Sequence, residues 1–237
     1  MRNIATMARR ELGAYFLSPI AYAVAAVFLF CTGLAFGLGT FQNGAESSLR
    51  SLLEWVLLIL VLVLPFLTMR LLSEEFRSGT IETLMTVPIT ETEVVLGKFF
   101  GAFVFYVILL ATLLLYPIVL SMFGPLDGWL LVSNYLGLLL LGALYISVGL
   151  LFSACSKHQI ICVMLSVALL VLMTWASFRL AQSVEGWPRI LLQHISVQTH
   201  FFGFVRGMVD VNHVVFFLTT TGLFLFWAVK LLEMRRW

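Results

Sequence analysis

The chain has 237 residues, of which 61% are hydrophobic and only 11% are charged. Soluble domains contain about 45 to 50% apolar and about 25% charged residues, so this composition excludes an ordinary soluble enzyme. The net charge of +2 is too small to indicate nucleic acid as a partner.

Six apolar segments of the chain are long enough to cross a bilayer, which requires about 20 helical residues. The connections between them are too short for a separate folded domain, whose usual minimum is about 50 residues. We therefore expect an all-α membrane protein in which residues 1–237 form a single transmembrane domain. The predicted spans are residues 20–41, 53–72, 96–121, 130–153, 159–180 and 213–232.

The basic residues predict the orientation of the spans. If the N terminus is cytoplasmic, ten of the 14 Lys and Arg residues fall on the cytoplasmic side and four fall outside, as the positive-inside rule requires. This distribution predicts a multi-pass protein with both termini in the cytoplasm. The four outer residues are Arg50, Arg179, Arg189 and Arg206.

Residues 1–18 are predicted to form an amphipathic helix in the membrane interface, ended by Ser18-Pro19. Glu11 falls on its apolar side and should therefore have a partner elsewhere in the protein. The alternative is that the segment is only a basic flank that orients the first span. The apolar face consists of Ile4, Met7, Ala8, Leu12, Tyr15 and Phe16.

The predicted spans contain no charged residue near the membrane midplane, which disfavours a carrier driven by ions or protons. The chain also lacks a phosphate-binding loop, because Gly97-Lys98 is followed by Phe99. Energy for any transport would therefore come from another chain. An intramembrane enzyme is a weaker alternative, since His194 and His200 are the only histidines that share one outer segment.

The segment 73–95 carries the most specific pattern. Gly79 can end a cytoplasmic extension of the second span, and Thr80 can cap a short helix that Pro88 stops. The sequence from Thr90 to Glu93 is a capping box that starts the third span.

On the short helix, Ile81, Leu84 and Met85 recur at helical spacing and form an apolar stripe too small to be a core. Such a stripe fits a groove on a partner protein. An ordinary capped membrane turn explains the same spacing equally well.

At these residues the sequence resembles the ABC-2 family of ABC transporter permeases, in which an acidic pair, Gly-Thr-x-Glu-x-Leu and a later Gly-Lys follow the second span. The resemblance covers nearly the whole chain. An outer segment from Thr199 to Asp210 and the short length make the gliding-motility-associated permeases the closest subfamily.

The resemblance implies a six-helix ABC-2 (type V exporter-like) permease fold and a dimer with a second copy or a paralogue. It implies a separate ABC ATP-binding subunit that holds ATP and magnesium, so this chain would bind no cofactor and be no enzyme. Residues 181–212 would form an outer re-entrant segment. The residues implied to contact the ATPase are Glu74, Glu75, Gly79, Thr80, Ile81, Glu82, Leu84, Met85 and Lys157.

The expected function is to couple ATP hydrolysis on that subunit to substrate movement, most simply export, across the bacterial inner membrane. An alternative is a non-transporting subunit that transmits mechanical work to another protein. Membrane lipids are the remaining expected partners, and the spans do not identify a substrate. Two small-residue pairs, Gly33 with Gly37 and Gly97 with Gly101, are candidates for close helix packing within or between subunits.

Overall fold

The computed structural model describes residues 2–41, 49–79, 90–122, 127–183 and 185–234. Nearly all of these residues are helical, and none of them lies in a β-strand. The helices are α1 (Arg2–Leu17), α2 (Pro19–Phe41), α3 (Leu49–Thr68), α4 (Ser73–Ser78), α6 (Glu91–Thr112), α7 (Leu115–Ser121), α8 (Gly128–Cys155), α9 (Gln159–Val171), the π-helical turn η1 (Leu172–Ala176), α10 (Ser177–Ser183), α11 (Trp187–Ile195), α12 (Val197–Val205) and α13 (Val211–Met234).

Within this described part, six helical stretches are long and apolar enough to cross a membrane. Each contains one of the six predicted spans or matches it closely, so the prediction of six membrane helices is confirmed. Continuous apolar sequence explains them, because a backbone in lipid must satisfy its polar groups within its own helix. The stretches are Pro19–Leu38, Arg50–Ser78, Glu91–Ser121, Gly128–Cys155, Gln159–Ser183 and Val211–Met234.

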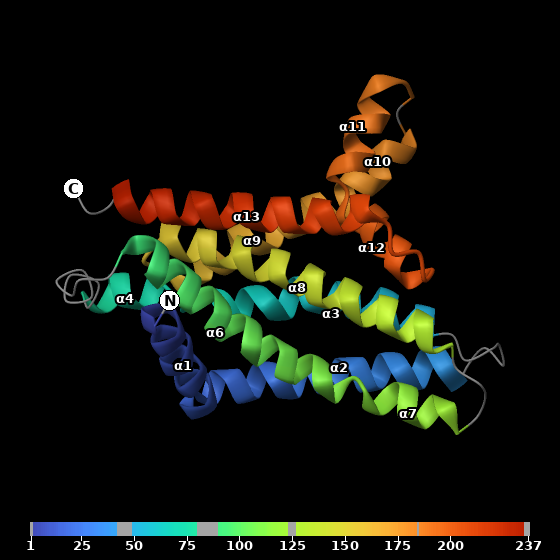
Figure 1. Cartoon of the computed structure of the whole chain (residues 1–237), viewed down its shortest axis with the longest axis horizontal. Helices are drawn as coiled ribbons and strands as arrows, with labels where there is room; N and C mark the ends of the chain where they lie inside the picture. Colours follow the sequence, from blue (N-terminus) through green and yellow to red (C-terminus); the bar gives the residue numbers. More distant parts are fainter. Residues whose placement is uncertain (1, 42–48, 80–89, 123–126, 184, 235–237) are drawn as a thin grey trace.

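Helix α8 lies at the centre of the bundle, between α6, α3, α9 and α13 (Figure 1). Its inner positions are filled by large buried side chains, among them Leu141, Leu144 and Tyr145. The Tyr145 hydroxyl lies 2.9 Å from Thr174 Oγ1 and so ties α8 to the π-helical turn η1. The core of the protein is therefore built around α8.

One end of the bundle, here called the proximal end, brings together the start of α1, all of α4, the start of α6 and the end of α13 (Figure 1). A side-chain contact fixes two of these elements, since Asn3 Nδ2 donates to Glu93 Oε1 at 3.3 Å. Segments that sequence analysis assigned to the cytoplasmic side thus share one end of the molecule.

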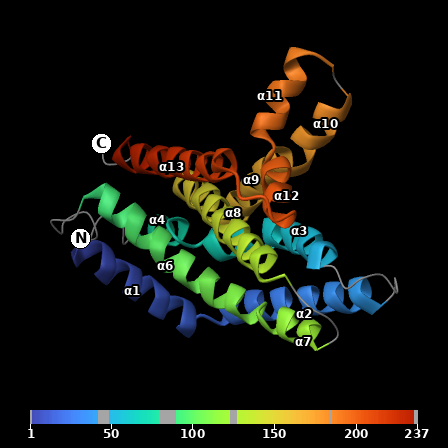
Figure 2. The same ribbon diagram turned by 45° about the vertical axis from the view of Figure 1, so that its right-hand side comes forward.

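At the opposite, distal end, α10 and α11 form a helical hairpin that projects from the bundle (Figure 2). Helix α12 instead packs across α8, where Ser133 Oγ donates to the carbonyl of Phe204 at 2.8 Å. Trp129 Nε1 adds a bond of 3.1 Å to the carbonyl of Gly207. The segment 181–212 is therefore anchored through α12, and its role as an outer cap stays a prediction.

The N-terminal segment forms α1 as predicted, and Ser18 separates it from α2, which begins at Pro19. Proline suits this position because the first helical N–H would be unpaired in any case. Much of the apolar face of α1 packs on α6, with Met7 buried, whereas Phe16 and Leu17 stay exposed. Ser18 thus forms an elbow between a helix held against α6 and the first membrane span.

Candidate functional site

The proximal end holds two capped helix ends that flank the predicted coupling segment. Gly79 ends α4 in the left-handed conformation with φ of 72°, which a glycine adopts at no steric cost. Thr90 caps α6, and its side chain and that of Glu93 complete the predicted capping box. Both predictions are confirmed. Thr80, Ile81, Glu82, Leu84 and Met85 lie outside the described residues.

The two adjacent glutamates of α4 have different surroundings. Glu74 receives two hydrogen bonds from the Arg70 guanidinium, at 2.8 and 2.9 Å, and its side chain is 48% exposed. Glu75 instead lies 2.7 Å from Lys98 Nζ, and its side chain is only 17% exposed. Of the acidic pair predicted to contact an ATPase, Glu74 is accessible, whereas Glu75 has a partner inside the protein.

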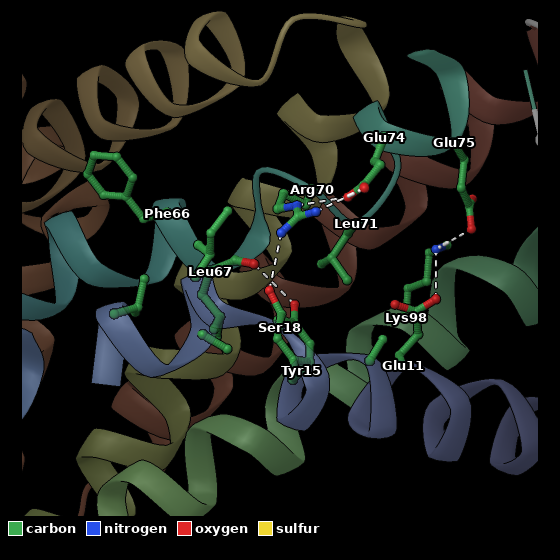
Figure 3. A pocket seen from close by; sticks show the side chains of 14 residues that line it. Glu11, Tyr15, Ser18, Phe66, Leu67, Arg70, Leu71, Glu74, Glu75 and Lys98 are labelled. Atoms are coloured by element: carbon green, nitrogen blue, oxygen red, sulfur yellow. Dashed lines mark hydrogen bonds and ion pairs between the residues drawn. The ribbon is translucent and has the colours of Figure 1, made fainter. Parts of the chain in front are cut away.

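Lys98 joins three helices through its ammonium group (Figure 3). Besides Glu75 of α4, it contacts Glu11 of α1 at 2.9 Å, and its own side chain is 2% exposed. The prediction that Glu11 has a partner elsewhere is therefore confirmed. Two carboxylates compensate one buried ammonium, a geometry that fixes α1 and α4 against α6.

Gly97 and Gly101 allow α1 to approach α6 closely. A Cβ atom at Gly97 would lie 2.5 Å from Met7 Cβ, and one at Gly101 would lie 2.7 Å from Glu11 Cβ. This pair therefore packs within the subunit. A Cβ at Gly33 would meet the Tyr116 hydroxyl at 3.7 Å, and one at Gly37 would meet nothing within 4 Å.

A break in the second membrane helix separates α3 from α4, although the sequence predicted one continuous span to residue 72. Ser153 of α8 bridges this break: its Oγ accepts from the amides of Leu72 and Ser73 at 2.9 and 3.0 Å and donates to the carbonyl of Met69 at 3.1 Å. Backbone groups that the helix leaves unpaired are thus satisfied from a neighbouring helix. The position of α4 depends on α8.

The elbow at Ser18 is tied to the same break. Arg70 Nη1 donates to Ser18 Oγ at 3.2 Å, and the Tyr15 hydroxyl donates to the carbonyl of Leu67 at 3.1 Å. Burial and, to a smaller extent, the Glu11 carboxylate raise the pKa of Tyr15, so its hydroxyl stays protonated and keeps donating. Movement of α4 would therefore be transmitted to α1 and α2.

Between these contacts lies a cavity of about 270 Å³, here called the elbow cavity. It is bounded by the elbow of α1 and α2, by the end of α3 with α4, and by Lys98 of α6 (Figure 3). Its walls contain two charged clusters, Arg70 with Glu74 and Lys98 with Glu11 and Glu75. The rest of the lining includes apolar side chains of α2 and α3.

Other predicted residues lie apart from this cluster. Lys157 is exposed in the turn between α8 and α9, and those helices both contact α4. His194 and His200 do not pair through their rings, because His200 Nε2 bonds to the backbone carbonyl of His194 at 3.2 Å. The ring partner of His200 is His213, with 2.9 Å between the Nδ1 atoms. In the described part of the chain no group of three or more metal-ligating residues occurs.

The sequence did not predict three side-chain contacts: the Arg70–Glu74 pair and the bridge from Ser153 at the proximal end, and the contact of His213 with His200 at the distal end. The Arg70 and Glu74 pair has the i, i+4 spacing of a helical ion pair and could have been found from that spacing. Ser153 and His213 carried no comparable local signal, since each meets partners that only the tertiary fold brings near.

The fold and the proximal cluster define a polytopic helical membrane protein in which buried charges hold α1 and α4 against α6. A family model described as an ABC-2 family transporter protein matches residues 32–231, and the chain belongs to that family. It is thus a permease-type membrane protein of the ABC transporters. A search among curated proteins found no match.

Proposed function

We propose that the chain is the membrane-spanning permease subunit of an ABC transporter in the bacterial cytoplasmic membrane. A separate ABC ATP-binding subunit hydrolyses ATP, and this chain moves a substrate, in the outward direction, across the membrane. The observation that carries the proposal is the family match over residues 32–231 together with the six membrane helices. The gliding-motility-associated group is the subfamily we propose, on the outer segment from Thr199 to Asp210.

The anchoring of α4 and α6 supports a coupling role for the segment between them. Gly79 and Thr90 define the two helix ends, and residues 80–89 connect them. A force on that connection would reach α8 through Ser153 and α1 through Lys98. We propose that residues 80–87 dock on the ATPase, with Glu74 and Lys157 beside them, and that Glu75 acts inside the permease to hold α4.

The active unit in this proposal is a dimer, formed with a second copy or a paralogue, with both termini of each chain in the cytoplasm. One bundle supplies half of a path, and the partner subunits hold ATP and magnesium. The ten basic residues assigned to the cytoplasmic side support this orientation.

Binding of an ABC ATP-binding subunit, which we expect a neighbouring gene to encode, tests the proposal. The two proteins are co-expressed, and the ATPase is recovered on tagged permease. Leu84→Asp should weaken the association about 5- to 150-fold, because a charge in an apolar groove costs about 1 to 3 kcal/mol. Glu82→Ala should retain the complex but uncouple ATP hydrolysis from substrate movement, because we propose that Glu82 pairs with a basic residue of the ATPase.

The matched control for this experiment is Leu191→Asp, an exposed leucine of α11 in the distal hairpin, outside the six membrane-crossing stretches. It should leave recovery of the ATPase unchanged. An aggregated Leu84→Asp permease whose soluble fraction still binds the ATPase would show that the stripe packs internally, and the coupling proposal would be wrong.

The alternative is a subunit that transmits motion to an external partner, and the projecting hairpin of α10 and α11 supports it. Helix α11 has no buried residue and exposes Trp187, Ile190 and Leu191. Substrate movement into sealed vesicles containing both subunits would favour the transporter. ATP-dependent change at the hairpin without any transported substrate would favour the alternative.

A further inference from the structure

We propose that the elbow cavity binds the headgroup of a phospholipid that carries a primary ammonium after its phosphate, as an ethanolamine headgroup does. The first reason is the order in which apolar and charged side chains follow one another along the cavity. Figure 3 shows Phe66 at one side, Arg70 with Ser18 in the middle, and Glu11, Lys98 and Glu75 at the other side. An acyl chain, a phosphate and an ammonium follow one another in the same order along such a lipid.

The apolar side of the cavity is lined by side chains that are exposed on two membrane-spanning helices. Ile20 of α2 and Phe66 of α3 both line it and are 39% and 46% exposed. Both belong to membrane-spanning helices near their proximal ends. A glycerol backbone and the first acyl carbons can therefore occupy this side while the chains remain in the bilayer.

The middle of the cavity suits a phosphate. Arg70 uses Nε and Nη2 on Glu74 and Nη1 on Ser18. A guanidinium has five N–H donors, so two remain after these three bonds. The Ser18 hydroxyl accepts from Arg70 and keeps its own hydrogen for an acceptor. A phosphate oxygen would thus receive charge-assisted bonds from groups that are already positioned.

The far side suits an ammonium. The cavity contains three carboxylates, Glu11, Glu74 and Glu75, against two cations, Arg70 and Lys98. Its formal charge with all groups ionised is therefore −1. Glu75 Oε2 is buried and has no hydrogen-bond partner in the described part of the chain, and such a buried acceptor is costly to leave unpaired. The zwitterionic ethanolamine headgroup leaves this total at −1, but it places its ammonium, which is a cation and a donor, beside the carboxylates while its phosphate lies beside Arg70.

The same charges argue against other headgroups. A glycerol headgroup brings a phosphate but no cation, which would increase the negative excess from −1 to −2. A choline headgroup brings a cation without N–H groups and cannot donate to Glu75 Oε2. The cavity volume of about 270 Å³ is near the lower limit of about 300 Å³ for small-molecule pockets, as expected for a headgroup alone.

The test uses the full-length protein in nanodiscs that contain equal amounts of ethanolamine, choline and glycerol phospholipids with identical chains. Lipids that stay bound after mild detergent extraction are identified by native mass spectrometry. We expect the ethanolamine lipid to be retained about tenfold more than the choline lipid, since a hydrogen bond to a charged group is worth roughly that factor. Equal retention of the three lipids, or no retention, would overturn the proposal.

Two variants on α2 form a matched pair. Val24 lines the cavity, whereas Val27 faces outward on the same helix. Val24→Trp should fill the cavity and abolish the preference, and Val27→Trp should keep it. Unchanged retention of the ethanolamine lipid in Val24→Trp would contradict the proposed place of binding.

Glu75→Gln gives an independent measure in case Val24→Trp does not fold. Glutamine keeps an oxygen for Lys98 but removes the negative charge. The ratio of retained ethanolamine lipid to retained choline lipid should therefore fall below about threefold, and retention of the glycerol lipid should increase. A preference that is unchanged would show that Glu75 does not meet the ammonium. Soluble phosphoethanolamine at millimolar concentration should not displace the lipid, because it lacks the apolar part. Displacement by it would identify a free headgroup as the ligand and overturn the lipid assignment.

Discussion

Lys98 Nζ lies 2.7 Å from Glu75 Oε1 and thereby fixes α4 against α6. A second contact, of 2.9 Å to Glu11, adds α1 to the same group. The segment that connects α4 to α6 in sequence is therefore attached to a part of the bundle that one buried ammonium holds together.

Replacing Lys98 with methionine should destabilise the protein strongly. Removing one partner of a buried ionic group leaves the other charges uncompensated, which costs about 3 to 5 kcal/mol. Lys230→Met is the control, because its pair with Glu233 is exposed and such pairs contribute about 1 kcal/mol or less. Thermal unfolding in detergent measures both. Adding Glu11→Gln and Glu75→Gln to Lys98→Met should recover part of the loss, and no recovery would show that packing of the lysine chain dominates.

Ser153→Ala should loosen the break between α3 and α4. The substitution leaves the amides of Leu72 and Ser73 without their acceptor, at a cost of about 1 to 3 kcal/mol for a buried group. Hydrogen exchange at these two amides should accelerate. Ser166→Ala is the matched control, because Ser166 is also buried but, among the described residues, its hydroxyl bonds within its own helix, to the carbonyl of Cys162. Equal effects of the two substitutions would contradict the bridging role of Ser153.

Alanine at Gly97 or Gly101 should push α1 away from α6. The added Cβ atoms would lie 2.5 Å from Met7 Cβ and 2.7 Å from Glu11 Cβ, too close without movement of a helix, and overpacking costs about 1 to 3 kcal/mol. Gly37→Ala meets nothing within 4 Å and should be neutral or stabilising by up to about 1 kcal/mol. The melting temperatures of the three variants measure these differences in stability. An unchanged melting temperature of Gly101→Ala would indicate that α1 is only loosely attached to α6.

The parts of the fold that local sequence determines were predicted. Span positions follow from runs of apolar residues, and the ends at Gly79 and Thr90 follow from backbone chemistry within a few residues. The partner of Glu11 was predicted to exist, because a carboxylate on an apolar face needs one, but not to be Lys98, which is 87 residues away. The position of Glu11 on an apolar face thus shows that it needs a partner, but it does not show which residue is that partner.

The parts that depend on tertiary packing were missed. Nothing near residues 69–72 marks the end of α3, since the break is stabilised by Ser153, more than 80 residues further along the chain. Glu75 was grouped with Glu74 because the two are adjacent, yet successive helical residues point in different directions. One of them reaches Arg70 and the other the buried Lys98.

The orientation of the spans can be tested with single cysteines in a chain whose Cys31, Cys155 and Cys162 are replaced. Gly79 ends α4 at the proximal end, and Gly186 precedes α11 at the distal end. A membrane-impermeant maleimide added to intact cells should label a cysteine at Gly186 and not one at Gly79. Labelling of both from outside would overturn the orientation and, with it, the proposed contact with a cytoplasmic ATPase.

The histidine pair at the distal end predicts a dependence of stability on pH. Because a carbonyl only accepts, His200 Nε2 donates to His194, and its Nδ1 must then accept from the Nδ1–H of His213. Burial lowers the pKa of His200, the His194 carbonyl opposes this in part, and the charge of His213 adds to it. The folded protein therefore binds a proton at His200 less readily than the unfolded chain.

The sign of the effect follows from this difference. Between the lowered pKa in the folded state and the unfolded value of about 6.5, the unfolded chain binds more protons, so stability falls as the pH decreases through that interval. Melting temperatures measured between about pH 7.5 and pH 5 should decrease by a few degrees. His200→Phe keeps a ring that can stack on Phe216, as His200 does at 4.0 Å between centroids, but cannot titrate. In this variant the melting temperature should depend less on pH in this interval. His158→Phe, at an exposed turn, should leave the pH dependence unchanged. An unaltered slope in His200→Phe would assign the acid sensitivity to other groups.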